Sequence, residues 1–70
     1  MKLKTFEVTI QFYHTNHQVY FSCQEFKAKN TREIFESLTR NYGPCRGKLN
    51  NTYYVFYKDG MEILAAIRPN

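Results

Sequence analysis

The fold of this chain is decided by residues 52–67, which read TYYVFYKDGMEILAAI. An Asp-Gly pair between two β-prone runs is typical of a β-hairpin, because a type I′ turn needs positive φ at both central residues. A two-residue turn at Asp59-Gly60 therefore sets the register of the two strands. The predicted cross-strand pairs are Lys58–Met61, Tyr57–Glu62, Phe56–Ile63, Val55–Leu64, Tyr54–Ala65 and Tyr53–Ala66.

This register gives the hairpin two faces, and both are partly apolar. One face carries Tyr54, Phe56, Ile63, Ala65 and Ile67. The opposite face carries Tyr53, Val55, Tyr57, Leu64 and Arg68, with Glu62 beside Tyr57. A 70-residue chain has little material with which to cover two faces, because a chain of this size buries only about 60% of the surface that its unfolded form exposes. We therefore expect one sheet face to stay uncovered and to be the working surface.

Residues 3–13 alternate between apolar and polar side chains, which is typical of a half-buried strand. The polar residues 14–17 predict a four-residue loop that leads into a second strand, with Tyr13 opposite Gln18. The pairs that follow are Phe12–Val19, Ile10–Phe21 and Val8–Cys23, and all six residues are expected in the core. The same register places Tyr20, Ser22 and Gln24 on the uncovered face.

The apolar parity of this second strand changes at Gln24-Glu25. A one-residue β-bulge at that position would absorb the change and keep Phe26 in the core. The alternative is that the strand ends near Gln24. The bulge is the interpretation we favour.

A helix is predicted from Asn30 to Tyr42. Asn30 is a suitable N-cap, and Glu33 is placed to reach back to the N–H of the cap, as in a capping box. Gly43-Pro44 ends the helix, and the helix carries a single apolar stripe of Ile34, Phe35, Leu38 and Tyr42. With residues 43–51 as a basic loop, the chain is predicted to be one α+β domain, residues 1–70, with the order β-hairpin–helix–β-hairpin (ββαββ). Its four-stranded antiparallel sheet carries the helix on one face.

The chain has a net charge of +4, and its ten Lys and Arg residues are spread along its length. This balance is compatible with an acidic or polyanionic partner and equally with ordinary solubility. No apolar run approaches the ~18 residues of a membrane span, so no membrane partner is expected. Residues 1–4 lead into the alternating pattern without the apolar region of a signal peptide. We therefore expect reduced cysteines and a cytoplasmic location, in the host cytoplasm if the chain is phage-encoded.

Residues with catalytic or metal-binding chemistry do not gather in the sequence pattern. His14 and His17 lie in the predicted turn, whereas Cys23 is about 20 Å further along a strand, and zinc needs its donors at about 2.0–2.3 Å. Cys45 beside Arg46 is the one plausible reactive thiol, and no histidine is near it in sequence. None of the six carboxylates pairs at a spacing that suggests acid–base catalysis. We predict a protein that is not an enzyme and has no metal or cofactor.

The uncovered face is predicted to be a platform of tyrosine, amide and hydroxyl side chains with a few aliphatics. Its predicted members are Glu7, Thr9, Gln11, Tyr13, Tyr20, Ser22, Gln24, Tyr53, Val55, Tyr57, Leu64 and Arg68. A protein or nucleoprotein partner would bury Tyr53, Val55, Tyr57 and Leu64, with Arg46 and Lys48 steering its approach. Alternatively, single-stranded nucleic acid would stack on Tyr13, Tyr20, Tyr53 and Tyr57. A third hypothesis is a structural homodimer that packs through the apolar run of residues 63–67.

Three consecutive segments together span most of the chain. They are the capped helix Asn30–Tyr42, the glycine-containing loop after it and the hairpin that begins YYVFYKDG at residues 53–60. In size and order of elements this layout resembles small anti-CRISPR and other host-modulating proteins of phages. The order is also similar to that of a small archaeal ribosomal protein, although this chain lacks the dense basic tail of that group. The first resemblance implies an inhibitor that occupies a surface on a larger host nucleoprotein complex, and we favour this hypothesis.

Overall fold

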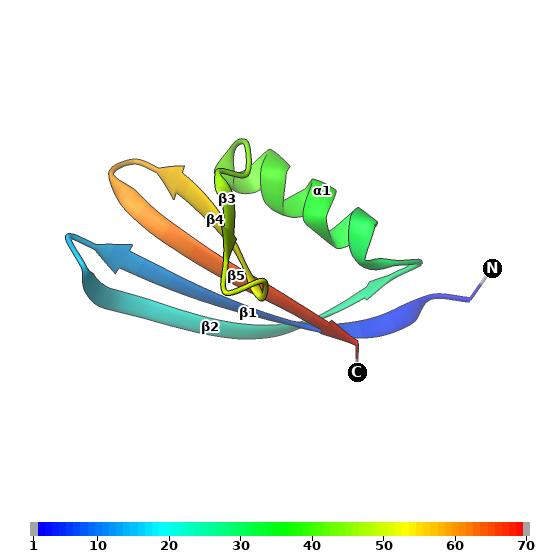
Figure 1. Ribbon diagram of the computed structural model, residues 1–70. Helices are drawn as coiled ribbons and strands as arrows, with labels where there is room; N and C mark the ends of the chain where they lie inside the picture. The colour runs from blue at the N-terminus through cyan, green and yellow to red at the C-terminus, as the bar shows by residue number, and fades with distance from the viewer. Residues whose placement is uncertain (1, 70) are drawn as a thin grey trace.

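The computed structural model describes residues 2–69, in which one helix packs on one face of an antiparallel sheet (Figure 1). The elements are β1 (Lys4–His14), β2 (His17–Ala28), α1 (Thr31–Tyr42), β3 (Gly47–Leu49), β4 (Tyr53–Lys58) and β5 (Met61–Pro69). The sheet has five strands in the order β2-β1-β5-β4-β3. The α+β class and the single helix are as predicted, but the prediction of four strands is wrong. The fifth strand is β3, which forms because part of the predicted basic loop pairs with β4.

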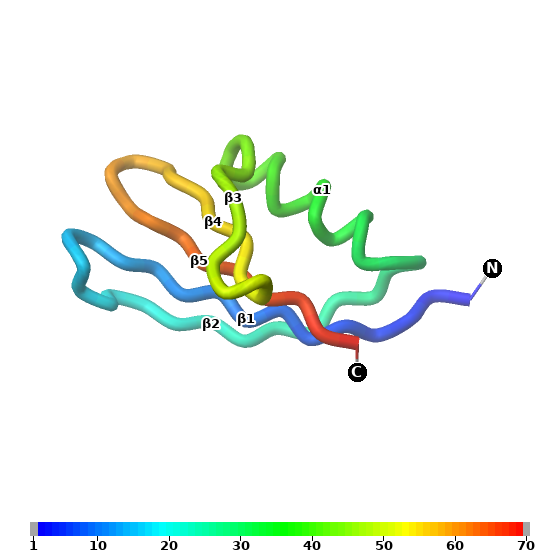
Figure 2. Tube along the Cα trace, viewed as in Figure 1, coloured from blue at the N-terminus to red at the C-terminus, as the bar shows by residue number. Residues whose placement is uncertain are grey.

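The last strand in sequence, β5, lies at the centre of the sheet, where it joins the two hairpins. It pairs with β4 on one side and with β1 on the other. Both hairpin turns lie at one end of the sheet, and the start of β1 and the end of β5 lie at the other (Figure 2). Residues 63–66 of β5 are buried and β5 has a neighbouring strand on each edge, so little of the run 63–67 is accessible to a second copy; the homodimer stays a prediction.

The β4–β5 hairpin has the predicted register. Asp59 and Gly60 have φ values of 53° and 78°, as a type I′ turn requires. The five pairs from Lys58–Met61 to Tyr54–Ala65 are the predicted ones. The pairing of the two strands ends there, before the sixth predicted pair, Tyr53–Ala66. The local turn therefore determines the pairing of these strands.

The β1–β2 hairpin differs from the prediction in its turn and in its register. The turn contains only Thr15 and Asn16, which have φ values of 53° and 64°. Tyr13 faces Gln18 as predicted, but the register then shifts, so that Phe12 faces Tyr20 rather than Val19. The bulge is therefore at Val19, and the predicted bulge at Gln24-Glu25 is wrong.

The physical reason for this register is packing on the helix side of the sheet. The ring centroid of Tyr20 lies 5.4 Å from that of Phe12, and the Phe12 centroid lies 5.9 Å from that of Tyr42 on the helix. A single shift at Val19 also aligns Phe26 with Phe6, so that no second irregularity is needed. An aromatic cross-strand pair thus replaces the aliphatic one that was predicted.

Because the bulge is at Val19 and not at Gln24-Glu25, residues 20–24 of β2 each point to the face opposite to the predicted one. Phe21 and Cys23 are exposed opposite the helix, so their predicted place in the core is wrong, as is that of Val19. Tyr20, Ser22 and Gln24 lie on the side of the sheet that faces the helix, so their predicted place on the uncovered face is also wrong. β2 remains an edge strand in either register.

Helix α1 begins and ends as predicted. The Asn30 side-chain oxygen accepts a hydrogen bond from the Glu33 N–H at 3.1 Å. The Glu33 carboxylate accepts from the N–H of Lys29 at 2.8 Å, one residue earlier than the predicted partner. Gly43, with φ of 87°, ends the helix, and its N–H donates to the Thr39 carbonyl oxygen at 2.8 Å.

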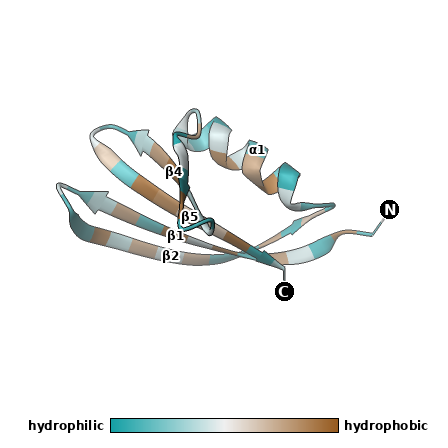
Figure 3. Ribbon diagram, viewed as in Figure 1, coloured by the Kyte–Doolittle hydropathy of each residue, from teal (hydrophilic) through white to brown (hydrophobic). Residues whose placement is uncertain are grey.

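The core lies between α1 and the sheet, where apolar residues of the central strands meet those of the helix (Figure 3). Its buried members are Phe6, Val8, Ile10, Ala28, Ile34, Leu38, Phe56, Ile63 and Ala65. The Phe56 ring lies at the centre, with the ring centroids of Phe35 and Tyr42 at 6.4 and 6.1 Å. The predicted stripe of α1 is therefore the stripe that packs.

The N-cap provides a direct test of the local rules. We expect Asn30→Ala to lower the free energy of unfolding by about 1 kcal/mol, because the Glu33 N–H loses its hydrogen-bond acceptor at the start of the helix. Urea unfolding followed by circular dichroism measures this loss. Asn41→Ala is the matched control, because Asn41 is an exposed helical asparagine outside the cap. An equal loss in both variants would contradict the capping role.

Candidate interaction face

The face of the sheet opposite α1 has no covering element within residues 2–69 (Figure 1). α1 packs on the face that carries Val8, Phe56 and Ile63. A twelve-residue helix with one apolar stripe covers one sheet face, and the short β3 extends the sheet sideways instead of forming a second layer. The predicted uncovered face is therefore present in the described part of the chain.

The strand pairings define which residues share this surface, which we call the open face. Its members are Thr5, Glu7, Thr9, Gln11 and Tyr13 of β1, Gln18, Phe21, Cys23, Glu25 and Lys27 of β2, Gly47 and Leu49 of β3, Tyr53, Val55 and Tyr57 of β4, and Glu62, Leu64, Ala66 and Arg68 of β5. Of the predicted partner contacts, Tyr53, Val55, Tyr57 and Leu64 are brought together here. Three of the four predicted stacking tyrosines also share the open face, whereas Tyr20 lies on the helix side.

The centre of the open face is apolar and already packed. Leu64 and Ala66 are only 7% and 3% exposed, although neither belongs to the core beneath α1. Leu64 lies between Gln11 of β1 and Val55 of β4, whose side chains stand beside it on the same face. Leu64 is therefore the floor of the open face and presents little surface of its own.

Tyr57 is an exposed side chain of this face that two neighbouring side chains hold in place. Its hydroxyl donates a hydrogen bond to a carboxylate oxygen of Glu62 at 2.7 Å. The Arg46 guanidinium carbon lies 5.7 Å from the centroid of the Tyr57 ring, within the range of a cation–π contact. Half of the Tyr57 side chain nevertheless remains exposed. A ring that is oriented in advance loses less conformational entropy when a partner covers it.

Arg46 and Lys48 lie on opposite sides of the sheet, although the sequence grouped them. The Arg46 N–H donates to the Val55 carbonyl oxygen at 2.7 Å, and its side chain extends over Tyr57 on the open face. The Lys48 amine lies 5.1 Å from the centroid of the Tyr54 ring on the helix side. Residues two apart in a regular strand point to the same face, but Arg46 precedes the first residue of β3 and Gly47 has a positive φ of 148°, so the strand alternation does not extend to Arg46. The two cations therefore cannot steer the same approach.

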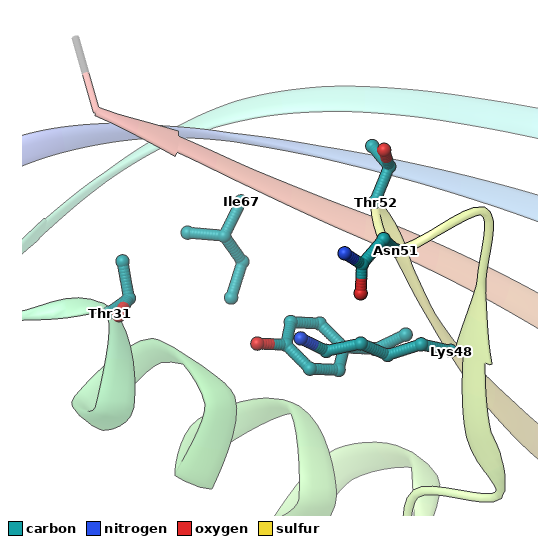
Figure 4. Close-up of a pocket in the computed structure, with 6 residues that line it drawn as sticks. Thr31, Lys48, Asn51, Thr52 and Ile67 are labelled. Carbon is teal, nitrogen blue, oxygen red and sulfur yellow. The ribbon is translucent and has the colours of Figure 1, made fainter.

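Lys48 belongs instead to a shallow pocket of about 250 Å³ between the start of α1 and the β3–β4 turn (Figure 4). The residues around it are Thr31, Lys48, Asn51, Thr52, Tyr54 and Ile67. Figure 4 shows the Lys48 side chain extending from β3 into the pocket, where its amine lies over the Tyr54 ring. This pocket is separate from the open face.

A row of three residues at the turn end of the open face was missed by the sequence analysis. Glu62 faces Tyr57 of β4 on one side and Tyr13 of β1 on the other, so two tyrosines flank one carboxylate. A depression of about 170 Å³ opens between them and the Thr15-Asn16 turn. The hydroxyl of Tyr13 donates to Gln11 at 2.7 Å. Only the pairing of β1 with β5 reveals this row, and the local patterns of the two hairpins do not contain it.

The hydrogen bond to Glu62 raises the pKa of Tyr57 above its usual value of about 10, and the charge of that carboxylate adds to the effect. The Arg46 cation opposes it and lowers the pKa. Because the folded-state pKa is raised, the stabilisation by this hydrogen bond is complete below pH ~10 and is lost as the pH rises through the folded-state pKa.

Alkaline titration checks this direction. Tyrosine ionisation is followed by the phenolate absorbance at about 295 nm, which rises near the usual pKa of ~10. In Glu62→Gln we expect Tyr57 to ionise at a lower pH than in the wild type, because the carboxylate that disfavours the phenolate is removed. Tyr57→Phe should lose one late-ionising tyrosine altogether. If Glu62→Gln leaves the titration of the Tyr57 hydroxyl unchanged, the hydrogen bond does not hold in solution.

The charges of the open face balance. Three glutamates (Glu7, Glu25 and Glu62) share it with three cations (Lys27, Arg68 and Arg46). The net charge of +4 is therefore carried elsewhere, on the helix side, the turns and the ends of the chain. The cations there are Lys2, Lys4, Lys29, Arg32, Arg40, Lys48 and Lys58.

The side chains of residues 2–69 form no group of three or more His, Cys, Asp or Glu that could hold a metal ion. Both cysteines are free thiols. Cys23 is exposed on the open face, whereas the Cys45 thiol donates to the Gly47 carbonyl oxygen at 3.2 Å and packs against the core. The helix found within these residues is too short and too polar to cross a bilayer.

No family model, curated protein or solved structure significantly matches this chain. A function for it has to be argued from the surfaces described above.

Proposed function

We propose that this protein is a non-catalytic binding protein whose open face docks on the surface of a larger protein or nucleoprotein complex and thereby inhibits or modulates it. The observation that carries this proposal is the uncovered sheet face, which has an apolar floor at Leu64 and a held, half-exposed Tyr57 beside it. Tyrosine and arginine are enriched among the residues that dominate binding energy at protein interfaces. Tyr53, Val55 and Tyr57 form the central contact, with Arg46 beside them.

The size of the open face suits a standard interface. The principal dimensions of the molecule are 42, 21 and 20 Å. A face of 42 by 21 Å corresponds to a footprint of roughly 900 Å², close to the ~800 Å² that each partner contributes to a standard interface. A chain this small can therefore use most of one face for a single stable contact.

The balanced charge of the open face favours a protein surface over nucleic acid. Affinity for nucleic acid depends largely on the number of phosphates that Lys and Arg neutralise, and the three cations here lie among three glutamates. Single-stranded nucleic acid is the second candidate, because Tyr13, Tyr53 and Tyr57 share the face and bases stack on such platforms.

The resemblance in size and order of elements to small host-modulating proteins of phages supports inhibition by occupying a surface. On that resemblance we propose a phage or mobile-element origin and an action in the host cytoplasm.

The test is affinity capture from the natural host, followed by measurement of binding to the purified partner. Tyr53→Ala with Tyr57→Ala should weaken the affinity at least tenfold, because the variant removes both aromatic contacts while leaving the core intact. Lys48→Ala is the control, since Lys48 is an exposed residue on the helix side of the sheet. Unchanged affinity in the folded double variant would refute docking through the open face.

Nucleic-acid binding is tested separately with labelled single-stranded oligonucleotides. If nucleic acid is the partner, the logarithm of the affinity falls linearly with the logarithm of the salt concentration. Tight, salt-sensitive binding that the double variant abolishes would favour this second candidate over a protein partner.

A further inference from the structure

The outer strand β2 is long, exposed and paired on one edge only. It has twelve residues, all of which except the bulged Val19 pair with β1, and no other strand of residues 2–69 lies beside it. Val19, Tyr20 and Phe21 are consecutive in this strand and are 52%, 60% and 55% exposed. An exposed edge strand with apolar side chains presents free backbone N–H and C=O groups that can pair with another strand.

The charged and proline residues that usually protect such an edge are absent from its first two thirds. Residues 17–24 read HQVYFSCQ and contain no Lys, Arg, Asp, Glu or Pro. Charged or proline residues on an edge strand normally discourage pairing with a second strand. The one protective device here is the bulge at Val19, and a regular stretch of strand follows it from Tyr20 to Ala28.

The opposite edge of the sheet is protected. β3 consists of Gly47–Leu49 only, and the turn that follows has Asn50 and Asn51 at positive φ values of 52° and 59°. A three-residue edge offers too few backbone groups to hold another strand. Of the two sheet edges within residues 2–69, β2 is therefore the one suited to pairing.

We propose that β2 pairs in antiparallel orientation with β2 of a second copy of this chain, which joins two sheets into one of ten strands. The two-fold axis runs perpendicular to the sheet, so both open faces lie on the same side of the dimer. This contact uses the open edge of each copy and leaves the two short β3 edges outside. Pairing of β2 with β3 of the next copy would instead build an open filament, and β3 is too short for it.

Charge supports a second copy as the occupant of this edge. Each copy has a net charge of +4, which opposes most approaches of two copies. Along β2 the two strands would meet mainly through residues 17–24, which contain no Lys, Arg, Asp or Glu. In the antiparallel registers centred on residue 22, 23 or 24, Glu25 and Lys27 each face an uncharged residue of the other copy. No like charges are placed directly opposite each other, which would destabilise the pairing.

The same registers bring the two Cys23 residues together. Cys23 of one copy then faces either Cys23 of the other copy or a residue two positions away from that Cys23. The corresponding Cβ separations are about 4.5–5.5 Å for directly opposed residues and about 7–8 Å for diagonal ones. Cys23 is an exposed thiol, so it can report on the contact.

The proposal is tested by sedimentation of the protein at concentrations from about 1 μM to 1 mM. Two copies that meet through an interface of modest size are expected to associate within this range. We expect a reversible monomer–dimer equilibrium. Tyr20→Lys and Phe21→Lys should each weaken it at least tenfold, because lysine on an edge strand opposes pairing. Tyr20 lies on the helix side and Phe21 on the open face, so only a contact through the edge is sensitive to both. Tyr57→Lys is the control, since Tyr57 is exposed on the open face of another strand.

Cross-linking gives the second measurement. In a Cys45→Ser background, a short bis-maleimide reagent should join two copies through Cys23, and additional Cys23→Ser should abolish the product. A monomer at every concentration, or a dimer that both lysine variants leave unchanged, would overturn the proposal. The lysine variants retain Tyr53 and Tyr57, so capture of a partner by a monomeric variant separates this dimer from docking through the open face.

Discussion

Phe56→Ala is expected to lower the free energy of unfolding by about 3–5 kcal/mol, the largest loss from a single substitution that we predict. The Phe56 side chain is fully buried and lies between the rings of Phe35 and Tyr42. Its removal loses the transfer free energy of a phenyl ring and leaves a cavity beneath the helix. A domain of 70 residues has a total stability of only about 4–10 kcal/mol. We therefore expect a large unfolded fraction at 25 °C, measured by the loss of the near-ultraviolet circular dichroism signal of the tyrosines.

The matched control is Phe21→Ala, which removes the same ring from an exposed position. Measured at micromolar concentration, this variant should lose less than about 1 kcal/mol, the usual range for a surface position in a strand. Phe56→Leu keeps most of the volume and should remain folded, so that its unfolding transition stays measurable. Equal losses in Phe56→Ala and Phe21→Ala would mean that the core is not where the structure places it.

Leu64→Ala is expected to lower the free energy of unfolding by about 2–3 kcal/mol, although Leu64 lies on the open face. The reason is that Leu64 is 7% exposed at the centre of the sheet, where strands on both sides pack against it. The loss lies at the lower end of the range for a buried leucine, because the site is next to solvent and can partly rearrange. Urea denaturation of the wild type and the variant gives the difference.

Tyr57→Ala provides the comparison for this second prediction. It shortens an exposed side chain on the same face, so we expect a stability loss below about 1 kcal/mol together with a large effect on partner binding. The opposite ranking, with Tyr57→Ala more destabilising than Leu64→Ala, would contradict the packed floor of the open face. Binding experiments on Leu64 variants therefore need a stability measurement beside them, whereas those on Tyr57 report binding directly.

The two proposed contacts use different parts of the same sheet. The open face offers a neutral, tyrosine-bearing surface, and the β2 edge offers unpaired backbone groups beside three exposed apolar side chains. Because the proposed two-fold axis is perpendicular to the sheet, dimer formation would place two open faces side by side. A dimeric partner or a repeated surface would then be bound by two contacts at once, and linked contacts bind more tightly than either contact alone.

The parts of the fold that the sequence predicted correctly are those set by neighbouring residues. The Asp59-Gly60 turn determines five cross-strand pairs, because positive φ at both residues permits only a tight turn between the strands. Asn30 and Gly43 likewise determine where α1 begins and ends through hydrogen bonds to residues within one helical turn. The existence of an uncovered face also followed from chain length and from the single apolar stripe of the helix.

The errors concern features that depend on residues distant in the sequence. The bulge lies at Val19 because Tyr20 packs against Phe12, which in turn meets Tyr42 of the helix. In the sequence alone, the apolar alternation of Val19, Phe21 and Cys23 points to the wrong face. β3 exists only because β4 lies beside residues 47–49, and its own sequence is not distinctive of a strand.

The candidate site likewise has features that local sequence predicted and features that it did not. Tyr53, Val55 and Tyr57 could be grouped from the sequence, because one local turn and the two-residue period of a strand place them on one face. The row of Tyr13, Glu62 and Tyr57, the separation of Arg46 from Lys48 and the burial of Leu64 required the tertiary structure. The row and the burial of Leu64 arise where β5 of the second hairpin pairs with β1 of the first, and the separation of the two cations arises where β3 pairs with β4. No local pattern encodes the pairing of β5 with β1, because it is stabilised by apolar contacts between segments far apart in the chain.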